Sequence, residues 1–173
     1  IEKLRDGLIQ IIDVSLDDIK HSDKMLAFLE KSISRLVDEY NFKLSEKEYI
    51  KIMYYIFRDF VGLNKIEPLL NDPYIEDIGC DGLNVPVYVV HQKFGSLKTN
   101  IIYTDMKESR DFVTKLAERC DRYISYAEPL LDGSLSDGTR VQASIASDVT
   151  TKGPTFSIRK FRSEPFSPID MIR

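Results

Sequence analysis

The sequence predicts an α+β protein in which an N-terminal helical bundle is followed by an α/β domain. Up to residue 63 the apolar residues recur at the spacing of amphipathic helices, whereas beyond it short stretches alternate in polarity, as half-buried strands do. The hydrophobic content of 43% supports a core, and 30% charged residues of both signs indicate a solvated surface rather than disorder. We therefore divide the chain into residues 1–63, 64–162 and a linker segment, 163–173.

Three helices are expected in the first part, over residues 1–14, over residues 23–40 and from Ser45 onward. Glu48 follows Ser45 by three residues, which is the pattern of a capping box at the start of a helix. The aromatic and methionine-rich stripe of the third helix fits the core of a bundle, as such stripes usually do, or a surface for a partner protein. This stripe consists of Tyr49, Ile52, Met53, Ile56, Phe57 and Phe60.

The second part is expected to combine a sheet with one long helix. Pro73 ends a short helix, Pro86 requires the start or the edge of a strand, and Asp105 caps the long helix. The expected helices cover residues 65–70 and 106–120, and the expected strands cover 75–78, 85–91, 99–103, a stretch near Leu130, 139–145 and 155–161.

Two of the expected strands carry an arginine on their polar side. Arg140 alternates with apolar residues on the first strand, which follows the tight turn that Asp137 and Gly138 predict. Arg159 alternates with apolar residues on the second. Residues 151–162 contain four basic side chains and no acidic one, in a chain whose net charge is −4. A basic polar face of this kind is a candidate anion site, because guanidinium groups suit phosphate oxygens. Ordinary solvent-exposed arginines are the alternative interpretation.

Composition argues against several other functions. The net charge of −4 argues against broad nucleic-acid binding, and no apolar run approaches the roughly 20 residues of a membrane span. The two histidines, His21 and His91, have no cysteine or histidine at ligand spacing, so no metal site is expected. Cys80 and Cys120 are interpreted as small buried residues rather than as a disulfide or a reactive thiol.

A longer pattern resembles a known family. The matching stretches have the sequences IEPLLNDPYIEDI (66–78), CDGLNVPVYV (80–89), PLLDGSLSDGTRVQASI (129–145), GPTFSIRKFR (153–162) and PFSPIDMI (165–172). In this order they resemble the N-terminal domain of the traffic ATPases of type II and type IV secretion systems, specifically the archaeal GspE/FlaI-like branch. The resemblance covers the chain from residue 66 onward, whereas the earlier residues match only in being helical.

This resemblance implies a PAS-like α/β fold for residues 64–162 and a hexameric ring in which the domain closes over ATP and Mg²⁺ held by a motor domain. Arg140 and Arg159 match the family's arginines that reach toward the nucleotide phosphates, Lys160 and Arg162 are accessory candidates, and Pro165 and Pro168 restrict a linker hinge. The implied partners are the chain's own motor domain, neighbouring subunits and a membrane-platform protein. The implied location is the cytoplasm, at the inner face of the cell membrane.

The resemblance also sets expectations for activity and geometry. The sequence has no Gly-Lys pair, hence no Walker A loop, so we expect an N-terminal region that ends before the motor domain and hydrolyses no ATP by itself. We expect Arg140 and Arg159 to project from one sheet face into solvent without saturating carboxylate partners. Alternatives to the secretion or pilus-assembly role are the same domain of an archaellum motor and a free-standing interaction or sensor module.

Overall fold

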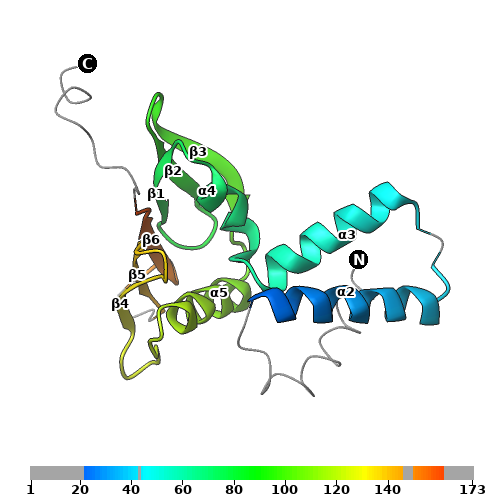
Figure 1. Ribbon diagram of the computed structural model, residues 1–173. Coiled ribbons are helices and arrows are strands. Elements are labelled where there is room, and N and C mark those ends of the chain that lie inside the picture. Colours follow the sequence, from blue (N-terminus) through cyan, green and yellow to red (C-terminus); the bar gives the residue numbers. More distant parts are fainter. Residues whose placement is uncertain (1–21, 43, 146–149, 162–173) are drawn as a thin grey trace. The chain divides into compact units, whose positions relative to one another are not determined.

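The computed structural model describes residues 22–42, 44–145 and 150–161, with side chains from residue 28 onward. The chain divides into two compact units, the first ending at Glu67 and the second beginning at Pro68, four residues beyond the boundary expected from the sequence. The described residues contain helices in the first unit and a sheet with helices in the second (Figure 1), so the predicted α+β class is confirmed. The PAS-like fold stays a prediction.

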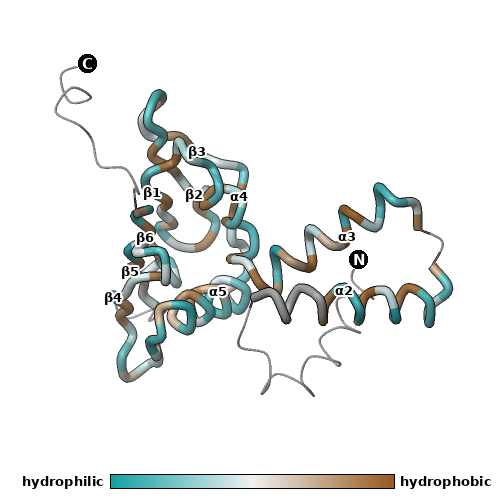
Figure 2. The backbone as a smooth tube through the Cα atoms, in the orientation of Figure 1, coloured by the Kyte–Doolittle hydropathy of each residue, from teal (hydrophilic) through white to brown (hydrophobic). Residues whose placement is uncertain are grey.

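The first unit contains helices α2 (Ser22–Glu39) and α3 (Glu46–Phe60), followed by the 3₁₀ turn η2 (Asn64–Ile66). The capping box at the start of α3 is present, because the Ser45 hydroxyl accepts from the Glu48 N–H and the Glu48 carboxylate accepts from the Ser45 N–H. Hydrophobic and hydrophilic residues alternate along α3 (Figure 2). The helix expected over residues 1–14 lies outside the described residues.

The predicted apolar stripes of α2 and α3 meet in one hydrophobic cluster. Tyr49, Met53 and Phe60 of α3 pack against it, which supports the core interpretation of that stripe. Tyr40, the last residue of the helix expected over residues 23–40, lies past the end of α2 and is half exposed. The buried members of the cluster are Leu29, Ile33, Leu36, Ile52 and Ile56.

The second unit is built on an antiparallel sheet in which the described strands are ordered β3-β2-β1-β6-β5-β4. The short helix α4 (Glu67–Asn71) precedes the sheet, and α5 (Met106–Arg119) lies between β3 and β4 in sequence. The strands are β1 (Ile75–Cys80), β2 (Pro86–His91), β3 (Gly95–Ile102), β4 (Leu130–Ser134), β5 (Arg140–Ser144) and β6 (Thr155–Arg159).

The third strand begins earlier than the sequence suggested. We expected a strand over residues 99–103, but β3 runs from Gly95, where it pairs with His91 at the end of β2. Its first half is exposed, and β3 lies at the edge of the sheet. An exposed edge strand has no buried face and therefore no apolar alternation to predict it.

The two faces of the sheet differ in character. On one face, the buried Val141 and Ala143 of β5 and Ile158 of β6 join an aromatic cluster in which Phe112 of α5 contacts Phe156 and Tyr103, with ring centroids 5.0 and 5.6 Å apart. The opposite face carries the polar alternates of the same strands. Cys80 and Cys120 are free and buried, as predicted.

The caps and turns that shape the second unit follow their sequence signals. The Asp105 carboxylate accepts from the Lys107 N–H at the start of α5, and Pro86 is the first residue of β2. Gly138 has a φ of +87°, which only glycine adopts without strain, in the turn that leads into β5. Among the described residues no helix is both long and apolar enough to cross a membrane.

Replacing Phe112 by Ala is expected to destabilise the second unit by about 3–5 kcal/mol, because the ring is 1% exposed and its removal leaves a cavity among aromatic side chains. Hydrogen exchange of the β5 and β6 amides would measure this loss. Tyr123→Ala serves as the control, since Tyr123 is 80% exposed and its loss should change stability by less than about 0.5 kcal/mol. Equal protection in the two variants would contradict the packing described here.

Candidate functional site

The register between β5 and β6 places the two predicted arginines side by side. Arg140 lies directly opposite Arg159 across the antiparallel pair, on the polar face of the sheet. Their side chains are 62% and 78% exposed, so both guanidinium groups are open to solvent. The expectation that they project from one face is therefore correct.

Each arginine has one carboxylate partner, which occupies one edge of the guanidinium group and does not saturate it, as expected. The Nε and Nη2 atoms of Arg140 donate to the two carboxylate oxygens of Asp132 on β4, at 3.3 and 3.1 Å. The Nε atom of Arg159 donates to Asp77 on β1 at 2.9 Å. Like charges placed opposite each other on a sheet destabilise it, and the two flanking carboxylates offset this cost.

The Asp132–Arg140 pair also alters the acid–base properties of the site. The hydrogen bonds and charge of Arg140 hold the pKa of the Asp132 carboxyl below its usual range. The Asp77–Arg159 pair could not be predicted from the sequence, because the two residues are 82 positions apart. Asp132 and Asp77 both compete with any anion for the guanidinium groups.

Between the two arginines the polar face is hollowed. A shallow depression of about 160 Å³ is lined by Arg140, Gln142, Ser157 and Arg159. Guanidinium N–H groups at its rim, with an amide and a hydroxyl beside them, form a set of donors suited to an anion of phosphate or sulfate size.

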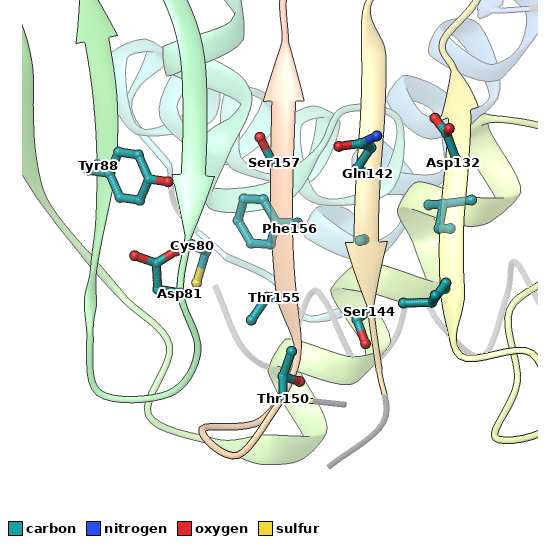
Figure 3. Close-up of a pocket in the computed structure, with 13 residues that line it drawn as sticks. Cys80, Asp81, Tyr88, Asp132, Gln142, Ser144, Thr150, Thr155, Phe156 and Ser157 are labelled. Atoms are coloured by element: carbon teal, nitrogen blue, oxygen red, sulfur yellow. The ribbon is translucent and has the colours of Figure 1, made fainter. Parts of the chain in front are cut away.

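A larger depression of about 480 Å³ adjoins the first, because Gln142 and Ser157 line both (Figure 3). Asp132 also lines the larger depression, and its carboxylate accepts a hydrogen bond from Arg140, which lines the smaller one. The other polar side chains that line the larger depression are Asp81, Tyr88, Ser144, Thr150 and Thr155.

Tyr88 reaches this hollow because its neighbour on β1 has no side chain. Gly79 lies opposite Tyr88, and a Cβ atom at Gly79 would stand 2.3 Å from Cζ of the ring. The phenol therefore lies over the Gly79 backbone, and its burial, together with the charges of Asp81 and Asp77, raises the pKa of Tyr88. Sequence reasoning missed this role; the only signal was a glycine inside a strand.

The accessory candidates are placed elsewhere or lie outside the described residues. The Nζ atom of Lys160 donates to the backbone carbonyl of Asp72, and burial lowers the pKa of this ammonium group. Lys160 lines neither depression. Arg162, Pro165 and Pro168 lie outside the described residues.

The end of β6 is held on both sides. The Phe161 N–H donates to the Thr139 hydroxyl at 3.1 Å, and that hydroxyl donates to Asp137 at 2.9 Å. The Lys160 N–H donates to the carbonyl of Glu76 at 2.8 Å. These bonds fix the backbone beside both arginines and give the chain a defined position at the point where it leaves the sheet.

Comparisons with known proteins give relatives without an assigned role. No family model matches the sequence. Three uncharacterized proteins of Methanocaldococcus jannaschii are similar to it: MJ0900 is 42% identical over 75% of this chain, MJ1288 is 34% identical over 86% and MJ0781 is 32% identical over 99%. The chain spans only 23%, 58% and 24% of their respective lengths.

A comparison with solved structures finds the VirB11 ATPase from the Brucella suis type IV secretion system, determined in complex with sulphate. The superposition has a TM-score of 0.48 at 21% sequence identity. It covers 62% of this chain and 32% of that one.

The pKa of the Asp132 carboxyl is expected to lie below its ordinary range in the folded chain and to rise toward that range in Arg140→Ala. Because the folded-state pKa is depressed, the pair contributes stability above the unfolded-state pKa and loses it as the pH falls through the folded-state value. Carbonyl ¹³C NMR titration measures both values. Arg159→Ala is the control and should leave the pKa of Asp132 unchanged. An identical pKa of Asp132 in the wild type and in Arg140→Ala would refute the assigned pairing.

Proposed function

We propose that the chain is the N-terminal, nucleotide-capping region of a hexameric ATPase that powers protein secretion or type IV pilus assembly. In this proposal Arg140 and Arg159 contact the phosphates of ATP and Mg²⁺ held by a motor domain, and the chain itself supplies no catalytic residue. The resemblance of residues 66–172 to the traffic ATPases supports it. The archaeal relatives, each longer than this chain, agree with a module of a larger protein.

One observation carries the proposal. Two guanidinium groups stand opposite each other on neighbouring strands, on an open polar face, at the rim of a depression that also offers an amide and a hydroxyl. A sheet gains nothing in stability from adjacent like charges, so the arrangement calls for an anion or for carboxylates. The carboxylates occupy one edge of each arginine, and the remaining N–H groups face solvent.

Phosphate binding would then proceed by exchange of partners. A polyphosphate carries more charge than one carboxylate, and its oxygens accept from several N–H groups at once, so it displaces Asp132 and Asp77 from the guanidinium groups. When the domain closes over the nucleotide, the arginines stabilise charge on the β- and γ-phosphates. When ATP is hydrolysed and phosphate leaves, the arginines return to their carboxylates and closure is no longer favoured.

The secretion and archaellum roles would use the same site. In both roles the chain would lie at the cytoplasmic face of the membrane, where a platform protein would bind the helical unit. A free-standing sensor module is the alternative from another class. A Gly-Lys-Thr or Gly-Lys-Ser loop found beyond residue 173 in a longer sequence of the protein would support the motor function over the sensor module.

Arg140→Ala and Arg159→Ala are each expected to lower ATP turnover of the parent enzyme by about 10²-fold, because each removes a donor to charge that develops in the transition state. The folded 173-residue chain should lose little thermal stability, since both pairs are solvent-exposed. Lysine at either position should restore activity only in part, because an ammonium group lacks the planar fork. Normal steady-state turnover in both alanine variants would end the phosphate proposal.

Asp132→Asn is expected to strengthen binding of tripolyphosphate to the chain by about two- to fivefold, because it frees Arg140 from a competing carboxylate. Isothermal titration calorimetry at low ionic strength measures the change. Asp111→Asn removes an exposed carboxylate from α5 and is the matched control for net charge. An equal gain in both variants would attribute the effect to net charge and would count against a competing role of Asp132.

A further inference from the structure

The larger depression is lined by carboxylates and hydroxyl groups that an anion site does not require. It contains two carboxylates, from Asp81 and Asp132, several hydroxyl groups and the ring of Tyr88 (Figure 3). Within the described part of the chain Asp81 takes part in no ion pair, so its carboxylate is available to a donor. A carboxylate beside hydroxyls and an aromatic ring is suited to a neutral ligand with hydroxyl and amino groups.

Ser144 provides an independent sign that this surface meets a ligand. The residue is 4% exposed and lines the depression, yet its hydroxyl has no hydrogen-bond partner among the described residues. A buried hydroxyl without a partner costs free energy, and such groups are normally satisfied by protein, water or ligand. A hydroxyl or amino group of a bound molecule would satisfy it.

The two depressions are continuous and aligned along the strands. Arg140, Gln142 and Ser144 are alternate residues of β5, so Ser144 lies about 13 Å along the strand from Arg140. Gln142 and Ser157 line both hollows and occupy the middle of this path. A ligand with phosphates at one end and a polar uncharged portion at the other would cover the whole path.

We propose that the larger depression is a nucleoside subsite, which holds the ribose and base of a nucleotide whose phosphates lie against Arg140 and Arg159. The inference rests on the phosphate role proposed above. Asp81 accepts hydrogen bonds from ribose hydroxyls, as carboxylates do in other nucleotide sites, and the Tyr88 ring offers a surface on which the base stacks.

The test compares two anions of similar charge, ATP and tripolyphosphate, on the 173-residue chain without Mg²⁺. ATP should bind about tenfold more tightly, because only ATP reaches the larger depression. Asp81→Asn and Ser144→Ala should each remove most of this difference and leave tripolyphosphate binding unchanged. Asp111→Asn, on α5, should change neither affinity. The Tyr88 ring resonances should shift with ATP and stay in place with tripolyphosphate.

The outcomes separate the two proposals. If tripolyphosphate binds through the arginines and ATP binds no more tightly, the nucleoside subsite is overturned and the phosphate role stands. A preference for ATP that survives Asp81→Asn and Ser144→Ala, with unshifted Tyr88 resonances, also overturns the subsite. If neither anion binds, or if the Arg140→Ala/Arg159→Ala double variant binds tripolyphosphate as the wild type does, the phosphate role fails and the subsite fails with it.

Discussion

The antiparallel pairing of β6 with β5 on one side and β1 on the other is the constraint on which the polar face depends. Its register sets Arg159 opposite Arg140 on β5 and opposite Asp77 on β1. Because side chains alternate between the faces of a strand, a shift of one strand by one residue would turn its arginine toward the apolar side. The buried alternates, Val141 and Ile158, hold the register, since they lose contact with the core if it slips.

The packing on the apolar face of the sheet thus fixes the positions of the residues on its polar face. Phe112 of α5 and Phe156 of β6 anchor the middle of the sheet from one side, so the backbone beneath the arginines is rigid while their side chains remain solvated. A rigid backbone with mobile charged side chains suits a site that exchanges one anionic partner for another, because the exchange requires only rotation of side chains. Thr139 and Lys160 secure the ends of the same strands.

The ion pairs on this face have two compatible interpretations. As structural elements, Asp132 and Asp77 offset the repulsion between adjacent guanidinium groups. As elements of a binding site, they hold the arginines in place while the site is empty. Both interpretations follow from exposure: a solvated ion pair contributes little to stability and therefore exchanges readily, whereas a buried pair would be difficult to separate.

The sequence by itself determined the α+β class, the capping box of α3, the Asp105 cap of α5 and the turns, and the buried cysteines. It also determined the strand alternation that puts Arg140 and Arg159 on polar faces, because each of these features depends on residues within a few positions of one another. Only the tertiary structure decided which strands are neighbours. The Asp77–Arg159 pair, the position of Tyr88 over Gly79 and the continuity of the two depressions all depend on it. Strand pairing is made by backbone hydrogen bonds between distant segments, which leave no local pattern in the side chains. The start of β3 was misjudged for a different reason, because an exposed edge strand has no apolar alternation.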